Sequence, residues 1–465
     1  MAIQTTSAIA LAKLATWTVR TFRLGAATTL PGKLARRVDP SILTRLSRSL
    51  PKGSVLVTGT NGKTTTTSLI SQMGEKAGWS IIHNHGGANL IDGLTSPFVQ
   101  RAGLGGSCAG DIAFMETDEA VVPRAVSEIQ PRGLVVTNFF RDQLDRFGEL
   151  DKTVSLVRKG VQALPAWSTV YLNADDPLVA SLRERADLQY VFFGLQAPEM
   201  GAKEMLQSSE AQVCPRCGAN LSYHFFYYAH HGDYYCTTCG FSRPKPTVYA
   251  SDIALHGLKG STLNLHNESS VFRVSVQLPG MYNLYNVLAA TAVATGLEIA
   301  SSDMEHALQH LPPAFGRMET LQVSGREMTI ALVKNPTGCN EVLRTFLEDG
   351  RDLYLLMALN DNTADGTDIS WIWDVDMEQL AKAASRIRSL TLTGQRAPEL
   401  AVRLKYAGVH VQQQDIIPTL EAAFQRALQT VPEGCMMQVM PTYTAMLALR
   451  EHFVRSGYAT QYWKE

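Results

Sequence analysis

The sequence predicts an α/β protein with a parallel-sheet domain, a small four-cysteine insert within that domain, and a second, Rossmann-like α/β domain. Three observations predict it. Short apolar runs alternate with helical stretches, two Cys-x-x-Cys pairs interrupt this alternation after residue 213, and it resumes beyond a proline-containing stretch at residues 311–317. The 465 residues, of which 45% are hydrophobic, suffice for two or three hydrophobic cores.

Bulk composition argues against several classes of protein. The formal net charge of -1 gives the whole molecule no general attraction to nucleic acid. No apolar run approaches the roughly 20 residues needed to span a bilayer. Seven cysteines, an odd number in a chain without a recognisable secretion signal, argue against a disulfide framework. We therefore expect a cytoplasmic protein that does not bind nucleic acid.

Residues 1–50 form a short basic segment. Residues 8–22 predict an amphipathic surface helix, because Lys13 and Arg20 interrupt its apolar positions. A functional alternative is that this segment rests peripherally on the inner face of an anionic membrane or on an anionic substrate. From residue 13 to residue 52 only Asp39 opposes the basic residues, which are Lys13, Arg20, Arg23, Lys33, Arg36, Arg37, Arg45, Arg48 and Lys52.

The first α/β domain is expected over residues 51–312. Its predicted strands are residues 54–58, 111–116, 133–137 and 169–172, with a helix that begins near Thr64. A further strand-like stretch follows Tyr249 and leads to an Ala-rich helix around residues 286–295. Two adjacent prolines mark residues 311–317 as a linker.

The second domain is expected over residues 316–465. Four apolar runs predict its strands, at residues 328–333, 353–358, 389–393 and 436–440. Helical stretches separate these runs, which is typical of a Rossmann-like sheet.

The segment that joins the first predicted strand to its helix has the composition of a phosphate-binding loop. Glycines allow backbone N–H groups to turn towards phosphate oxygens, Lys63 would neutralise the β- and γ-phosphates, and the Thr64 hydroxyl would hold Mg²⁺. The commonest pattern has a glycine where this chain has Val57, and a chance turn is the alternative. The strand–loop–helix context favours an ATP site made by Gly59, Thr60, Asn61, Gly62, Lys63, Thr64 and Thr65.

Two Cys-x-x-Cys pairs lie within residues 210–245. Four thiolates suit tetrahedral Zn²⁺, and Gly218 and Gly240 follow the two pairs as knuckle turns would require. A redox dithiol and an iron–sulfur site are the lesser alternatives. We expect a structural zinc ribbon, because so short an insert has too little core to fold without a metal. The expected zinc ligands are Cys214, Cys217, Cys236 and Cys239.

The phosphate loop and five later motifs, in order, resemble the Mur ligase superfamily. The resemblance implies that Glu116 binds magnesium with Thr64, that Asn283 and Asn286 lie near the adenine, and that Arg317 belongs to the nucleotide site. Gln143 and Tyr282 stand where the common pattern has histidine, and the loop begins too early for a preceding UDP-sugar domain. The five motifs are residues 115–119, 138–145 (NFFRDQLD), 173–176 (NADD), 280–286 (GMYNLYN) and 316–319 (GRME).

An Asp- and Asn-rich loop at residues 359–374 resembles the amidating branch of that superfamily, the MurT-like ligase subunits. The resemblance implies a heterodimer with a GatD-type glutaminase, whose Cys–His pair Asp368 would complete as the acidic member. It also implies the reaction: ATP would activate the α-carboxylate of D-glutamate in the lipid II stem peptide, and ammonia from the partner would convert it to D-isoglutamine. Lys63, Glu116 and Asp368 are the implied catalytic residues.

Two alternatives stay open at this stage. A stand-alone Mur-type or folylpolyglutamate-type ligase would keep the ATP chemistry but add an amino acid. A non-catalytic ATP-binding scaffold could use the zinc ribbon and its nearby aromatic residues to contact nucleic acid, although the near-neutral charge opposes this.

Overall fold

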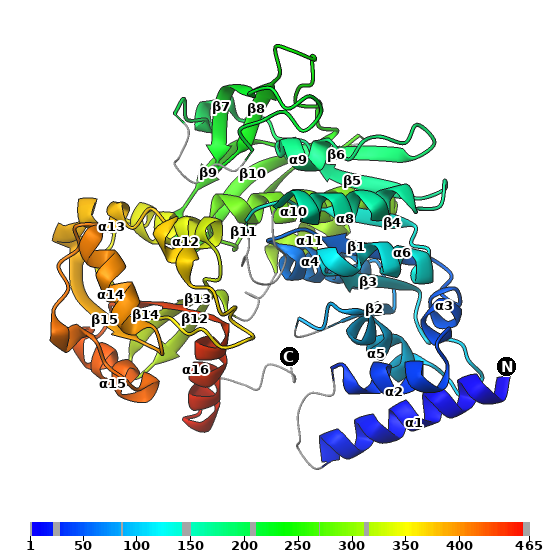
Figure 1. The fold of residues 1–465 in the computed structure, drawn as a ribbon, viewed down its shortest axis with the longest axis horizontal. Helices are drawn as coiled ribbons and strands as arrows, with labels where there is room; N and C mark the ends of the chain where they lie inside the picture. The colour runs from blue at the N-terminus through cyan, green and yellow to red at the C-terminus, as the bar shows by residue number, and fades with distance from the viewer. Residues whose placement is uncertain are drawn as a thin grey trace.

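A computed structural model gives the arrangement of the chain (Figure 1) and describes residues 2–21, 28–84, 87–141, 150–204, 211–268, 270–310 and 316–458. Within these ranges the strands form a nine-stranded sheet, a five-stranded sheet and a two-stranded hairpin. The fold class predicted from the sequence, α/β with a parallel sheet and a separate C-terminal sheet, is confirmed.

The nine-stranded sheet has the order β11-β10-β9-β6-β5-β4-β1-β3-β2. Pairing is parallel from β2 through to β9 and antiparallel among β9, β10 and β11. All four strands predicted before residue 200 are present. The bounds are β1 Ser54–Thr58, β2 Ile81–His83, β3 Ile112–Glu116, β4 Gly133–Val136, β5 Thr169–Asn173, β6 Gln189–Leu195, β9 Val248–Leu255, β10 Ser261–His266 and β11 Val271–Val276.

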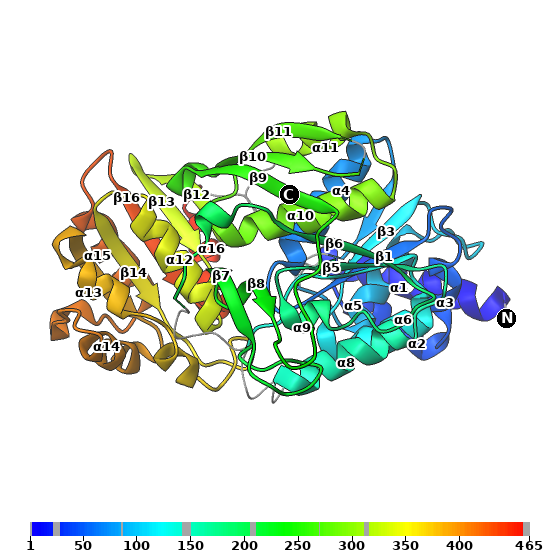
Figure 2. The same cartoon turned by 90° about the horizontal axis from the view of Figure 1, so that it is seen from above.

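Helices bury both faces of the parallel part of this sheet, which explains why its strands are continuously apolar. Val55 and Val57 of β1 pack with α4 (Lys63–Lys76) and α10 (Met281–Gly296). The intervening Leu56 packs on the opposite face, with α5 (Ile91–Arg101), α6 (Val122–Ile129) and α8 (Leu150–Gln162). Figure 2 shows α4 and α10 on one side of the strands and α6 and α8 on the other.

The N-terminal segment folds as α1 (Ala2–Thr21), α2 (Leu30–Val38) and α3 (Ile42–Ser47), packed beside α5. The predicted amphipathic helix is only partly right. Small and polar side chains such as Thr5, Ala8 and Ala12 are buried, whereas Ile3, Leu14 and Trp17 are 84%, 58% and 61% exposed. The reason is that α2 and α5 pack closely against α1 and bury only a narrow strip of its surface. Among the described residues no helix has the length and hydropathy to cross a membrane.

The charge of the basic segment is partly neutralised within the fold. Arg45 pairs with the buried Asp39 at 2.9 Å, and Arg36 pairs with Glu128 at 2.5 Å. The Thr5 hydroxyl also donates to Asp39, which fixes α1 against the turn before α3. Two of the basic residues of this segment, Arg36 and Arg45, therefore stabilise packing within the fold.

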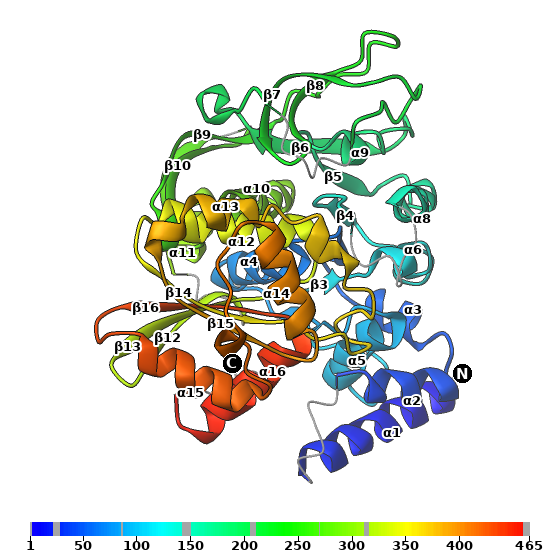
Figure 3. The ribbon, with the colours of Figure 1, turned by 60° about the vertical axis from the view of Figure 1, so that its left-hand side comes forward.

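The four-cysteine insert carries the hairpin of β7 (Ser222–Tyr228) and β8 (His231–Tyr235). Figures 1 and 3 place this hairpin at the end of the molecule opposite α1. The start of β8 lies against the segment that joins β5 to α9 (Pro177–Ala180), since the Gly232 N–H donates to the Asp175 carbonyl at 3.0 Å.

The C-terminal sheet has the order β12-β13-β16-β14-β15, antiparallel between β12 and β13 and parallel elsewhere. One face packs on α12 (Pro336–Glu348), α13 (Glu378–Lys382) and α14 (Ala397–Tyr406), and the other on α15 (Leu420–Thr430) and α16 (Tyr443–Arg455). The strands predicted beyond residue 320 are confirmed within two residues at either end. Their bounds are β12 Arg317–Val323, β13 Arg326–Ala331, β14 Leu353–Ala358, β15 Ile387–Thr393 and β16 Met436–Pro441.

Candidate nucleotide and ligase site

The loop between β1 and α4 has the backbone shape that the glycines predict. Gly59 and Gly62 have φ of +123° and +86°, a region that residues with a side chain rarely adopt. A Cβ on Gly59 would lie 2.3 Å from Thr137 Oγ1, and one on Gly62 would lie 2.0 Å from Asn286 Oδ1. Only glycine fits at either position, and the N-terminus of α4 is left facing the loop, as anion binding requires.

Lys63 bends back over this loop. Its Nζ donates to the carbonyls of Gly59 at 2.6 Å and Thr60 at 3.3 Å, and it pairs with Glu119 Oε1 at 3.1 Å. Lysine and glutamate are both buried, so each charge is compensated by the other. The sequence reading did not single out Glu119, which lies three residues beyond Glu116 in η1 (Glu119–Val121).

Thr64, in the first turn of α4, meets Glu116 at the carboxyl end of β3. The Thr64 hydroxyl donates to Glu116 Oε2 at 2.8 Å. Asn84 fixes the strand end, because it accepts from the Glu116 N–H and donates to the Glu116 carbonyl, each at 2.8 Å. A hydroxyl and a carboxylate oxygen are the hard donors that Mg²⁺ prefers, so these two side chains could hold the ion together with phosphate oxygens.

The asparagines of the predicted adenine motif lie beside the same loop. Asn286 contacts Gly62 and donates to Asn283 Oδ1 at 2.9 Å, and Asn283 donates to the Pro279 carbonyl. The Arg317 backbone begins β12, but its side chain lies outside the described residues, as do Gln143 and most of the predicted linker. The phosphate loop thus has α10 on one side and the start of the C-terminal sheet near it.

Asn335 joins the C-terminal part of the chain to the phosphate loop. Its Nδ2 donates to Asn61 Oδ1 at 3.1 Å, while its Oδ1 caps α12 by accepting from the Gly338 N–H at 2.8 Å. Asn138 holds the Asn61 backbone from the other side, accepting from its N–H at 2.9 Å and donating to its carbonyl at 3.0 Å. A pocket opens between the two parts, lined by both and including Tyr282, Asn286, Lys334 and Asn335.

A larger groove of about 690 Å³ continues from this pocket. The β7–β8 hairpin lines one wall and α12 and α13 line the other. Its charged side chains are of both signs: Arg141, Glu204, Glu341, Arg344, Asp374, Asp376, Glu378, Lys382 and Arg403. Within the groove, Arg141 of the ATP-site part of the chain pairs with Asp374, just after η4 of the C-terminal part, at 2.9 Å.

Glu341 lies between the pocket and the groove and lines both. It is buried, and burial raises the pKa of its carboxyl to about 7, with Arg344 opposing the shift and Glu348 adding to it. A group that titrates near neutral pH at the junction of two cavities is a candidate for proton transfer. No sequence pattern points to Glu341, because a glutamate inside a helix has no distinguishing motif.

Glu341→Gln is expected to raise the free energy of unfolding at pH 8 and to leave it nearly unchanged at pH 5. A carboxyl whose pKa is higher in the folded than in the unfolded state loses its stabilising contribution as pH rises from about 4.3 to about 7. The gain at pH 8 should reach at most about 3.5 kcal/mol. Denaturant unfolding at the two pH values measures it, with Glu433→Gln, an exposed glutamate that lines neither cavity, as control. An equal gain at both pH values would contradict the raised pKa.

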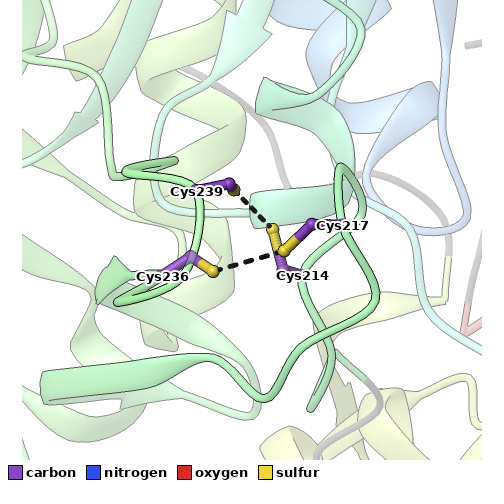
Figure 4. Close-up of side chains that lie close together, drawn as sticks. All are labelled: Cys214, Cys217, Cys236 and Cys239. Carbon is purple, nitrogen blue, oxygen red and sulfur yellow. Dashed lines mark hydrogen bonds between the residues drawn. The ribbon is translucent and has the colours of Figure 1, made fainter.

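The four cysteines converge from two turns (Figure 4). Cys214 Sγ lies 3.6 Å from Cys239 Sγ, and Cys217 Sγ lies 3.6 Å from Cys236 Sγ. These separations exceed a disulfide bond of about 2.05 Å. They approach the edge of about 3.8 Å expected for a tetrahedron with Zn–S bonds of 2.3 Å. Gly218 and Gly240 have φ of +75° and +73°, as predicted for the two knuckles.

The Asp-rich loop after β14 uses most of its carboxylates internally. Asp361 pairs with Arg396 at 2.7 Å, and the buried Asp365 accepts from the N–H and hydroxyl of Thr444. The half-buried Asp368 accepts from the N–H and hydroxyl of Ser370, the first residue of η4 (Ser370–Trp373), at 2.8 and 2.9 Å. Asp368 lies on a different element from the phosphate loop and has no hydrogen bond to it.

The structure therefore brings most of the predicted nucleotide residues together around one loop and holds the four cysteines together elsewhere. The sequence reading missed Glu119, Asn335 and Glu341. Asn335 could have been found, since an Asn-Pro step after an apolar strand is a typical helix start. The other two become visible only through their neighbours in space.

Two family models match the chain. Residues 57–225 match the Mur ligase middle domain, and residues 332–446 match the MurT ligase C-terminal domain. Solved structures share the fold. A pseudomurein peptide ligase type C from Methanothermus fervidus aligns with a TM-score of 0.66 and 23% identity, covering 89% of this chain and 80% of that one. A MurF ligase from Thermotoga maritima, in complex with ADP, aligns with a TM-score of 0.60 and 13% identity, covering 92% and 84%.

Curated relatives extend the match to nearly the whole chain. The MurT subunit of lipid II isoglutaminyl synthase (glutamine-hydrolyzing) of Staphylococcus aureus strain COL is 36% identical over 439 residues, which is 92% of this chain and 93% of the relative. The MurT subunit of Streptococcus pneumoniae strain R6 is 35% identical over 437 residues, with the same two coverages. The chain therefore belongs to the MurT family of Mur-ligase-type subunits.

Proposed function

We propose that this chain is the ATP-dependent ligase subunit of a lipid II isoglutaminyl synthase. In the proposed reaction the γ-phosphoryl group of ATP passes to the α-carboxylate of D-glutamate in the stem peptide. Ammonia then attacks the acyl phosphate, so that phosphate leaves and D-isoglutamine and ADP result. The observation that carries the proposal is the family membership together with the phosphate loop, where Lys63 lies over the Gly59 carbonyl and the adjacent Thr64 bonds Glu116 at the end of β3.

The chain's own residues have distinct proposed tasks. Lys63 and the backbone N–H groups of residues 59–65 hold the phosphates and neutralise the transferring group, and Asn283 and Asn286 lie on the adenine side with Arg317. Thr64 and Glu116 would hold Mg²⁺, which supplies positive charge to the phosphate oxygens. Glu119 keeps Lys63 in place over the loop until nucleotide binds.

The domain boundaries follow the same division of tasks. Residues 51–312 form the ATP-binding domain and residues 316–465 the MurT-type C-terminal domain. Residues 210–245 form a zinc ribbon, with Zn²⁺ bound by the four cysteines. The supporting observation is the matched pair of 3.6 Å sulfur separations on two glycine knuckles.

Ammonia would come from a GatD-type glutaminase bound as a heterodimer. We propose Asp368 as the carboxylate that orients the partner's histidine, because it is half-buried and, among the described residues, bonds only Ser370, whereas Asp361 and Asp365 are held by Arg396 and Thr444. Trp373 and Tyr406 give the adjoining surface an apolar character that suits a protein partner, since they are 51% and 78% exposed and contact each other edge-on.

Lipid II presents its peptide at a membrane surface, and α1 offers a means of approach. Ile3, Leu14 and Trp17 are exposed on this helix, and Lys13 lies among them. Apolar side chains with neighbouring positive charge favour the interface of an anionic bilayer. We propose peripheral contact through this face.

A mass spectrum of lipid II tests the function. The chain is incubated with lipid II, ATP, Mg²⁺ and glutamine, with and without the candidate glutaminase. We expect one stem-peptide carboxylate to become an amide, only when the partner is present. Addition of an amino acid, or reaction of a soluble precursor alone, would instead identify a stand-alone ligase. It would also rule out the proposed partnership with the glutaminase.

A further inference from the structure

A second cluster of metal-binding side chains lies beside the phosphate loop, apart from the four cysteines. Asp176 follows β5 and caps α9, His230 lies in the turn that joins β7 to β8, and His231 is the first residue of β8. All three side chains are completely buried. Figure 1 shows the elements concerned, with the hairpin above α9 and β5.

The two imidazoles converge on one carboxylate oxygen. The Nε2 atoms of His230 and His231 each lie 3.4 Å from Asp176 Oδ2. This is longer than the 2.7–3.2 Å of an ordinary N–H···O hydrogen bond. Among the described residues none of the four ring nitrogens has a hydrogen-bond partner. Buried polar groups are rarely left this way, so the cluster lacks a component.

The neighbouring carboxylate shows how the same fold satisfies a buried charge without a metal. Asp175 pairs with Arg243 at 2.6 Å and accepts from the Leu195 N–H and the Tyr285 hydroxyl, each at 2.8 Å. Asp176 receives three backbone N–H groups, from Phe139, Leu178 and Val179, but no Lys or Arg pairs with it within the described part of the chain. Two unbonded histidines occupy the place of such a cation.

The separations fit a metal ion. With metal–nitrogen and metal–oxygen bonds of about 2.0–2.1 Å, ligands at two corners of a tetrahedron lie about 3.3–3.4 Å apart. The three ligand atoms are all within 4.8 Å of one another, so a small ion can bridge them. Two imidazoles and a carboxylate are three ligands that Zn²⁺ accepts readily, and a buried water molecule would supply the fourth.

The surroundings indicate a structural site. The rings of Phe140 and Tyr285 lie 5.0 and 5.1 Å from the His231 ring, and Tyr228 lies 4.6 Å from it. These aromatic side chains close the cluster off from solvent, which leaves no access for a substrate.

We propose that Asp176, His230 and His231 bind a second zinc ion, which fastens the turn of the β7–β8 hairpin to the end of β5. The site communicates with the nucleotide loop through two neighbouring residues. The Phe139 N–H donates to Asp176, and the Phe140 N–H and carbonyl both bond the Thr60 hydroxyl, at 3.0 and 3.1 Å. The ion therefore fixes the segment on which the first threonine of the phosphate loop rests.

Metal content and anomalous diffraction test this proposal on the full chain. The protein is purified with Zn²⁺ present and passed over a chelating resin. Two zinc ions per chain are expected, and an anomalous map at the zinc edge should show one peak among the cysteine sulfurs and one between Asp176, His230 and His231. A wild-type crystal with no peak at Asp176 overturns the proposal, whether or not any variant folds.

Variants give an independent readout. His230→Gln with His231→Gln should lower the zinc content by one ion per chain and weaken nucleotide binding, whereas His224→Gln, an exposed histidine on the same hairpin, should leave both unchanged. If the double variant keeps both ions, the ligands are wrongly assigned. A single peak at Asp176 with none at the cysteines would support the site at Asp176 and rule out zinc binding by the four cysteines.

Discussion

Lys63→Ala is expected to abolish ATP-dependent amidation, with kcat at least about 10³-fold lower, while the chain remains folded. The reason is electrostatic, because the ammonium group that lies over the Gly59 and Thr60 carbonyls places a positive charge directly at the phosphate-binding backbone. Single-turnover phosphorylation of lipid II, with ATP held far above its Kd, measures the effect separately from nucleotide affinity.

The structure adds a complication that requires a control. Removing Lys63 leaves Glu119 buried without its partner, which is expected to cost a few kcal/mol of stability in its own right. The double variant Lys63→Met with Glu119→Gln removes both charges and should restore the stability but not the activity. Glu119→Gln alone should keep most of the chemistry. Retained amidation in either Lys63 variant would show that the loop is not the ATP site.

Asp368→Asn is expected to abolish glutamine-dependent amidation and to spare amidation driven by added ammonium. If Asp368 orients the partner's histidine, the amide leaves the geometry intact but favours the wrong tautomer, which lowers catalysis by about 10³–10⁴-fold. The chain's own phosphorylation step does not involve Asp368, since no hydrogen bond connects it to the phosphate loop. Paired assays with glutamine and with ammonium chloride, both with the glutaminase bound, measure the two steps separately.

Two variants in the same loop serve as controls. Ser370→Ala removes the hydroxyl that donates to Asp368, and Asp361→Asn changes a carboxylate that pairs with Arg396, so both should change the glutamine-dependent rate only slightly. Equal loss of both activities in Asp368→Asn would indicate a folding or docking defect. Equal retention of both would assign the partner's acid to another residue.

The sequence by itself determined the fold class, the position of the phosphate loop and the grouping of the cysteines. Each depends on residues close in the chain. Apolar runs such as 54–58 predict buried strands because both faces of a parallel strand are covered. The glycines of the phosphate loop predict positive φ angles, and the structure confirms them at Gly59 and Gly62. The motif order also indicated the family, which the curated relatives confirm.

Only the tertiary structure decided which distant side chains complete these features. Lys63 meets Glu119 across 56 positions, Asn335 reaches Asn61 across 274, and Asp176 faces two histidines from a later hairpin. No local pattern encodes such pairs, because they depend on strand order and on how the hairpin folds back over β5. The exposed apolar face of α1 could not be predicted for the same reason, because the packing of neighbouring helices decides which side of α1 is buried.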